Sequence, residues 1–218
     1  RTVTGVQTCA LPIWELKMAD APKIKTPLIL ASASPRRSEL MRDAGYEFEV
    51  IAPEVEEAHD ESLSCEELTV ENARRKALAV ARMRPGALVI GADTLVYLDG
   101  IPIAKPRDLE EAASMLRRLS GRTHEVCTGV AVACDGGAQM STFHVISDVT
   151  FKSLTDDVIR DYHSRIDPLD KAGAYAVQEE SAMIIERVEG SWSNVKGLPM
   201  ERLRAELADW MERSGCRV

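Results

Sequence analysis

The chain has 218 residues, of which 45% are hydrophobic, so it is long enough to bury a core in one large domain or in two small lobes. Its formal net charge of -8 excludes a broad nucleic-acid surface, because such a surface needs many Lys and Arg side chains to neutralise phosphates. We therefore expect no nucleic-acid partner. No run of about 18 apolar residues occurs, so we also expect no membrane span.

The cysteines indicate neither a disulfide framework nor a zinc site. No two of them have the CxxC spacing, and none has a metal-ligand spacing with the four histidines. Unpaired thiols are typical of a reducing compartment, so we expect a cytoplasmic protein. The cysteines are Cys9, Cys65, Cys127, Cys134 and Cys216.

The N-terminal segment differs in character from the rest of the chain. Residues 3–13, VTGVQTCALPI, are similar to the translation of a sequencing-adapter oligonucleotide. A secretory signal is the alternative interpretation, but the segment lacks the sustained apolar run of such a signal. We therefore predict a non-native, disordered tail over residues 1–17 and one folded domain over residues 18–218, with Met18 as the natural start.

From Thr26 onward, short apolar runs alternate with amphipathic stretches, which indicates an α/β protein. The predicted strands are 27–32, 46–53, 87–98, 124–134, 139–151, 173–177 and 182–188. The predicted helices are 35–45, 64–84, 108–119, one that begins at Thr155, and 199–213. No repeat, low-complexity segment or linker divides these elements, so we expect one domain with two lobes.

Local sequence signals define several ends of these elements. Ser64 with Glu67, and Asp108 with Glu111, have the spacing of capping boxes at helix N-termini. Residues 135–137, Asp-Gly-Gly, separate two strand-like segments and predict a hairpin.

A serine- and arginine-rich segment follows the first predicted strand. Ser34 suits the N-cap of the next helix and Pro35 suits its first position, which places Arg36 and Arg37 in the first turn. Cations there oppose the helix dipole, so an anion is expected to compensate them. Together with the hydroxyls of Ser32 and Ser34, they predict a phosphate cradle, whereas two solvated surface arginines are the alternative.

An aspartate interrupts the apolar strand at 87–98. Asp93 has apolar residues on both sides, and an unpaired buried carboxylate is unfavourable, so it must be paired, protonated or bound to a metal. If Gly91 allows a ligand to approach and Mg²⁺ neutralises the charge, Asp93 could deprotonate a water molecule. A carboxylate that is hydrogen-bonded to a nearby turn is the alternative.

Further charged residues could join this aspartate. Glu56 and Glu57 lie in an acidic connection and offer the oxygen ligands that Mg²⁺ prefers, although such loops are often only solvated. Lys76, on the apolar face of the long helix, and Lys105, before Pro106, are candidate phosphate partners or ordinary surface lysines.

These segments together resemble the Maf family of nucleotide pyrophosphatases, from residue 28 to about residue 207. The matching segments are LASASPRR at 30–37, Glu57, ARRKA with Lys76, GADT at 91–94, Lys105-Pro106, SGRTHEVCTGVA at 120–131, DKAGAYAVQ at 170–178, Asn194 and GLP at 197–199. The resemblance implies a mixed, twisted sheet with flanking helices and two lobes around a central cleft, as in Maf and ITPase-like folds.

The resemblance also implies a reaction and the roles of several residues. A nucleoside triphosphate is cleaved between its α and β phosphates to the monophosphate and pyrophosphate, with Mg²⁺ or Mn²⁺ as cofactor. Asp93 matches the proton acceptor, Glu57 and Lys76 match active-site positions, and Lys105 matches a phosphate-side lysine. Glu57 and Asp93 are the expected metal ligands. The family further implies removal of unwanted nucleotides, a link to the arrest of cell division, and a homodimer.

Three positions resemble the branch of the family that acts on dTTP, UTP and modified pyrimidine nucleotides. They are Arg36, Thr94 and Gln178, where the 7-methyl-GTP branch has an aromatic residue, Gln and Glu. A neutral Gln178 amide offers a donor and an acceptor to a uracil or thymine edge. A 7-methyl-GTP pyrophosphatase, and a nucleotide-binding regulator of septum formation with little turnover, are the alternative functions.

Some residues depart from the family pattern or have a second interpretation. Glu179 and Glu180 follow Gln178 where relatives have glycine, and Trp192 and Lys196 replace other residues, which affects the expected shape of the base pocket. For His124, which matches a family segment, we expect a structural role, because a single histidine beside a strand is often only hydrogen-bonded.

Overall fold

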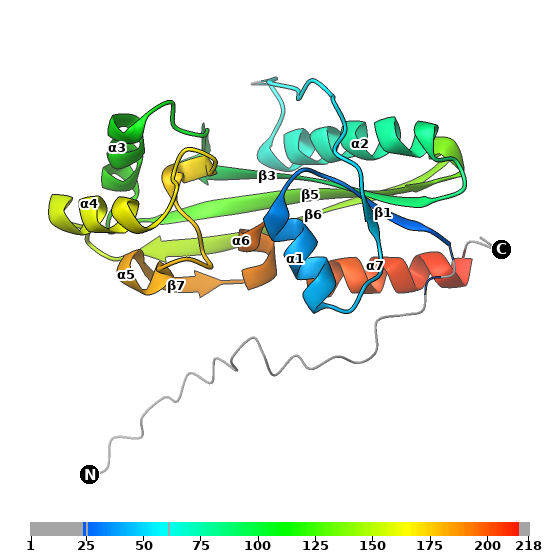
Figure 1. The fold of residues 1–218 in the computed structure, drawn as a ribbon. Coiled ribbons are helices and arrows are strands. Elements are labelled where there is room, and N and C mark those ends of the chain that lie inside the picture. Colours follow the sequence, from blue (N-terminus) through cyan, green and yellow to red (C-terminus); the bar gives the residue numbers. More distant parts are fainter. Residues whose placement is uncertain (1–23, 25, 61, 214–218) are drawn as a thin grey trace, which may run out of the picture.

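The computed structural model describes residue 24, residues 26–60 and residues 62–213, and a seven-stranded sheet of mixed direction lies at its centre (Figure 1). The strands are β1 Leu28–Ala31, β2 Glu49–Val50, β3 Leu88–Leu98, β4 Ile101–Ile103, β5 Thr123–Cys134, β6 Gln139–Phe151 and β7 Ile185–Glu189. The helices are α1 Pro35–Asp43, α2 Cys65–Met83, α3 Leu109–Leu119, α4 Asp156–Arg165, α5 Ser181–Ile184, α6 Trp192–Lys196 and α7 Met200–Arg213. The predicted α/β class and mixed sheet are confirmed, whereas the predicted tail, residues 1–17, lies outside the described residues.

The sheet combines a short parallel part with a long antiparallel part. Its order is β2-β1-β3-β5-β6-β7, with β4 paired to β3. Strand β1 runs parallel to β2 and β3, while β3, β5, β6 and β7 are antiparallel neighbours. Among the described residues, no helix is both long and apolar enough to cross a bilayer.

Helices cover both faces of one half of the sheet. Figure 1 shows α2 along one face and α1 with α7 along the other. Ala73, Ala77 and Val80 of α2 pack with Ile29 and Val89 in one hydrophobic core. The opposite core joins α1 and α7 to the other side of the same strands, which agrees with the continuous apolar runs of β1 and of the first part of β3.

A separate core lies at the other end of the sheet and makes a second lobe. Leu116 of α3 and Ile159 of α4 pack there against the far ends of the long strands. Strand β3 contributes to both lobes, because Ala92 belongs to the core beneath α1 and α7, and Val96 belongs to the core beneath α3 and α4. Asp93 therefore lies on β3 at the junction of the two lobes.

Two glycines allow α2 to approach the sheet closely. A Cβ atom at Gly129 of β5 would overlap backbone atoms of Thr69 and Val70, and one at Gly91 of β3 would overlap the carbonyl oxygen of Ala73. Any larger side chain at these positions would push α2 away from the sheet. This close packing fixes the distance between α2 and the sheet, and with it the position of the polar side chains of α2 relative to β3.

The predicted helix N-termini are largely confirmed. Ser64 and Glu67 form the reciprocal capping box at α2, with N–H to oxygen distances of 2.9 and 3.2 Å between them. Asp108 caps α3 by accepting from the Glu111 amide at 2.8 Å. The predicted box there is incomplete, because the Glu111 carboxylate instead accepts from the backbone N–H of Arg107.

Some predicted strands are wrong or shorter than expected. Residues 173–177 form no strand, because Gly173 and Ala174 have φ angles of 72° and 61° in a 3₁₀ turn, and a strand cannot continue through left-handed backbone. The strand predicted at 182–188 begins as the short helix α5, and β2 pairs over only part of 46–53. Cys65 and Cys127 carry free thiols, as predicted.

Candidate active site

A cavity of about 1340 Å³ lies at the junction of the two lobes. Its lining contains every predicted site residue except Ser32 and the candidate Glu56, and those that line it are Ser34, Arg36, Arg37, Glu57, Lys76, Asp93, Thr94, Lys105 and Gln178. Ser32 is buried behind this lining, where its hydroxyl accepts from Arg37 and from the backbone N–H of Ser34. Side chains from distant parts of the chain thus meet around one space.

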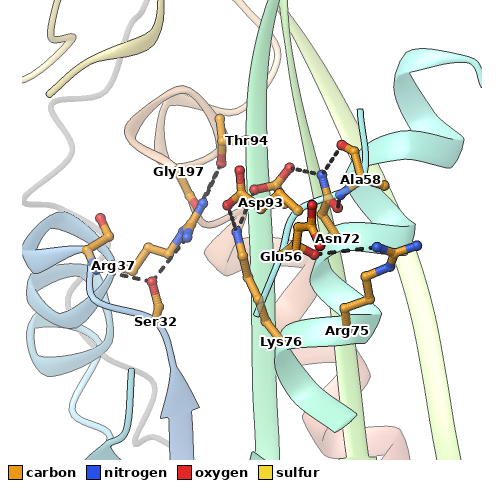
Figure 2. A network of polar contacts seen from close by, with 12 residues as sticks. Ser32, Arg37, Glu56, Ala58, Asn72, Arg75, Lys76, Asp93, Thr94 and Gly197 are labelled. Carbon is orange, nitrogen blue, oxygen red and sulfur yellow. Dashed lines mark hydrogen bonds and ion pairs between the residues drawn. The ribbon is translucent and has the colours of Figure 1, made fainter. Parts of the chain in front are cut away.

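A lysine holds two carboxylates together at the base of the cavity. The Nζ atom of Lys76 lies 2.7 Å from Oδ1 of Asp93 (Figure 2) and 2.6 Å from Oε1 of Glu57. The Asp93 side chain is only 7% exposed, whereas that of Glu57 is 46% exposed. Because charges this deeply buried must be paired, Lys76 is the partner that the sequence required for Asp93.

Asn72 joins this cluster and was not predicted from the sequence. Its Nδ2 atom donates to Oδ2 of Asp93 at 3.3 Å, and its Oδ1 atom accepts from the backbone N–H of Ala58 at 2.7 Å (Figure 2). A signal was present, since Asn72 precedes Lys76 by four residues and therefore lies on the same helix face. Without the partner strand, however, that spacing does not distinguish a site residue from a buried amide.

Arg37 has more protein partners than the predicted phosphate cradle implies. Its guanidinium donates to the Gly197 carbonyl at 2.7 Å, to Ser32 Oγ at 3.1 Å and to Thr94 Oγ1 at 2.9 Å. Burial lowers the pKa of Arg37, and the negative charge of Asp93 opposes that shift. Arg37 therefore crosslinks α1, β3 and the end of α6, and binding of a phosphate by it stays a prediction.

Arg36 and Lys105, the other predicted phosphate partners, also line the cavity. Arg36 forms a 3.3 Å ion pair with Asp170, in which both side chains are partly exposed. Lys105 is exposed on the cavity lining. Ser34 occupies the predicted N-cap position of α1, but its side chain makes no capping hydrogen bond. These groups are accessible to an anionic ligand, and their contacts with phosphate stay predictions.

The residues predicted to select the base already have protein partners. Thr94 Oγ1 lies 3.0 Å from the hydroxyl of Thr128. The Gln178 amide donates to the carboxylate of Glu179 at 3.0 Å, so this unusual neighbour influences its orientation. Lys196 also lines the cavity and pairs with Glu39 at 2.9 Å, with only 9% of the lysine side chain exposed.

His124 lies in an aromatic cluster and has the structural surroundings that we expected. Its Nε2 atom is 2.8 Å from the hydroxyl of Tyr175, and its ring makes edge contacts with Phe151 and Tyr175. Its Nδ1 atom has no hydrogen-bond partner among the described residues. Burial lowers the pKa of His124 from 6.5 to about 4, so the neutral ring is the folded form near neutral pH.

This burial predicts a loss of stability in acid. Between pH 6.5 and 4 the unfolded chain binds the His124 proton and the folded chain does not, so this contribution is full above pH 6.5 and falls as the pH falls. Its size is about 3 kcal/mol. In denaturant titrations, His124→Gln should reduce the fall in unfolding free energy between pH 7 and pH 4 by that amount. An unchanged pH dependence in the variant would contradict this role.

The donor set fits a divalent cation that binds together with a nucleotide. No group of three or more His, Cys, Asp and Glu side chains within residues 26–60 and 62–213 is arranged to hold a metal ion. The carboxylates of Glu57 and Asp93 nevertheless converge on the Nζ atom of Lys76. Mg²⁺ is commonly bound by one or two carboxylates with waters and substrate phosphates, and two convergent carboxylates satisfy that requirement.

The model of the family described as Maf-like protein matches residues 27–210 of this chain. The chain therefore belongs to the Maf family. A dTTP/UTP pyrophosphatase of Akkermansia muciniphila is 51% identical over 174 residues, which are 80% of this chain and 91% of that protein. Proteins of the same name from Desulforamulus reducens and Acetivibrio thermocellus are 46% and 42% identical, over 81% and 84% of this chain and 93% and 94% of theirs.

Proposed function

We propose that this chain hydrolyses dTTP and UTP to the monophosphate and pyrophosphate. One observation carries the proposal: the buried Asp93, bridged by Lys76 to Glu57, lies in the cavity between the lobes of a Maf-family chain. The relatives named above support the choice of substrate, because they carry the name dTTP/UTP pyrophosphatase. Modified pyrimidine nucleotides would enter the same site.

In this mechanism Asp93 is the general base. One Asp93 oxygen accepts a proton from a water molecule, whose oxygen attacks the α phosphorus, and the bond from that phosphorus to the oxygen bridging to the β phosphorus breaks. The Lys76 ammonium has three N–H groups, so it can donate the third to a phosphate oxygen while it keeps its contacts with Glu57 and Asp93. Arg36 and Lys105 stabilise the charge that develops on the departing pyrophosphate. A divalent metal held by Glu57 and Asp93 would supply additional neutralisation of the phosphates and a more acidic water.

Four finer properties are part of the same proposal. We propose Mg²⁺ or Mn²⁺ as the cofactor, since both accept carboxylate and phosphate oxygens. We also propose a homodimer, on the resemblance, and a location in the cytoplasm, on the free thiols of Cys65 and Cys127. The segment over residues 1–17 is proposed to be dispensable for this activity.

The base preference tests the proposed substrate. We expect kcat/KM for dTTP and UTP to exceed that for 7-methyl-GTP by about tenfold or more, because a mismatched base leaves buried polar groups unpaired. Gln178→Glu should reduce this ratio, since a carboxylate offers acceptors only. Pyrophosphate release on a panel of nucleotides would measure both.

Glu179→Gln is the matched control, because it changes the neighbour that accepts from the Gln178 amide and leaves residue 178 unchanged. It should keep the preference for dTTP and UTP. A wild-type chain that turned over 7-methyl-GTP best would support the alternative branch. Tight binding of nucleotides with almost no turnover would support a regulator and contradict the enzyme.

A further inference from the structure

Asn72 connects three parts of the site with one buried side chain. The residue is 2% exposed and lies one turn before Lys76 on the face of α2 that packs on the sheet. Its amide accepts from the N–H of Ala58 at 2.7 Å and donates to Oδ2 of Asp93 at 3.3 Å, and it lies 3.4 Å from the Ala58 carbonyl. Figure 2 shows Asn72 between Ala58 and Asp93. It therefore links α2, β3 and the acidic loop before α2.

Two side chains of α2 hold the acidic loop: Lys76 pairs with the Glu57 carboxylate at 2.6 Å, and Asn72 accepts from the backbone N–H of Ala58 at 2.7 Å. The backbone N–H of Ile51 still bonds to the Leu30 carbonyl, but residues 52–60 contain neither helix nor strand, so no strand ladder holds them. Arg75 also reaches the loop, at the Glu56 carbonyl, but over 3.4 Å and from a side chain that is 43% exposed. Since Glu57 directly precedes Ala58, the hydrogen bond from Ala58 to Asn72 fixes the backbone from which the Glu57 side chain extends.

The same amide also determines the orientation of Asp93. One carboxylate oxygen of Asp93 contacts Lys76 and the other accepts from Asn72, so the two contacts together fix the plane of the carboxylate. A general base acts on a water molecule only when a lone pair points toward it. Rotation of this carboxylate would misdirect that lone pair, even if Lys76 remained paired.

We propose that Asn72 is a positioning residue. It holds the acidic loop and the Asp93 carboxylate in fixed positions relative to each other, so that the carboxylates of Glu57 and Asp93 converge on one cation. Its effect on turnover rests on the proposed function, whereas its hold on the loop does not. A buried amide that serves only folding would make the same contacts. The two roles differ in what is lost when the side chain is removed.

Two substitutions separate the parts of this role. In Asn72→Ala, the Ala58 amide should exchange with deuterium at least about tenfold faster, because its acceptor is gone. The value of kcat for dTTP should fall by about tenfold to a hundredfold, as expected for a misplaced catalytic group. KM should change by less than about threefold, since Arg36 and Lys105 are untouched. In Asn72→Asp, the acceptor for Ala58 remains but the donor to Asp93 is lost, so protection should persist while kcat still falls.

Thr69→Val is the matched control on the same helix face. The Thr69 hydroxyl is fully buried and bonds to the carbonyls of Cys65 and Glu66, without touching Ala58 or Asp93. It should lower the melting temperature and leave kcat and the exchange of the Ala58 amide unchanged. The proposal is overturned if Asn72→Ala behaves like Thr69→Val, or if its Ala58 amide exchanges at the wild-type rate. Absence of turnover in the wild-type chain would instead contradict the proposed function, because the exchange measurement does not need turnover.

Discussion

Asp93→Asn should lower kcat for dTTP by about 10²–10⁴-fold while the chain still folds. The amide has the same size as the carboxylate, but it cannot take a proton from water and brings no charge to a metal. Lys76 keeps its contact with Glu57, so the buried ammonium is not left without a partner. Because one charged contact is lost, we expect a decrease in unfolding free energy of about 1–3 kcal/mol.

Pyrophosphate release at saturating dTTP and thermal melting would measure the two effects. Asp99→Asn is the matched control, since it is the same chemical change just beyond the end of β3, in an exposed pair with Arg122. The control should have nearly normal turnover. If Asp93→Asn kept kcat within about tenfold of the wild type, a group other than Asp93 would have to accept the proton.

Gly129→Ala should destabilise the fold by about 3 kcal/mol or more, at the upper end of the range for overpacking. The added Cβ would meet backbone atoms of Thr69 and Val70, and backbone cannot move aside as a flexible side chain does. The melting temperature should fall by about 6–12 °C. Since α2 must then move away from the sheet, Lys76 would withdraw from Asp93 and kcat would fall as well.

Gly86→Ala provides the comparison for that measurement. Gly86 follows the end of α2, and a Cβ atom there would have no heavy atom within 4 Å. This substitution should leave the melting temperature and turnover close to their wild-type values. A melting temperature of Gly129→Ala within about 2 °C of the wild type would show that α2 is not held against β5 as closely as described.

The sequence predicts well the long strands that turn residues delimit. Apolar runs located β3 and β5, and β6, which follows the turn at 135–137, coincides with its predicted range 139–151 although most of it is exposed or half-buried. The strand predicted at 173–177 was wrong, because the apolar residues of this segment are buried in and after a turn. Apolar character alone does not distinguish such a turn from a strand. The helix α6 was missed, because five residues are too few to show helical periodicity.

The residues of the candidate site also differ in whether the sequence predicts them. Asp93, Glu57 and Lys76 were predicted because charges among apolar residues, and the family motifs, identify them individually. The partners of Arg37 were not predicted, since the Gly197 carbonyl is 160 residues away and a backbone oxygen leaves no mark on a sequence. Asn72 was missed for a related reason: its role depends on a partner on β3 that only the folded arrangement supplies.

Because β3 passes through both lobes, we expect the described part of the chain to unfold as one cooperative unit. Asp93 and Thr94 stay paired with Gly129 and Thr128 across the junction, so β3 and β5 continue from one hydrophobic core into the other without interruption. The lobes consequently cannot rotate about the cavity like two hinged bodies unless ladder hydrogen bonds break. Rearrangement on nucleotide entry therefore falls to the segments that lie outside the sheet. A destabilising change in one lobe should therefore also lower the stability of the other.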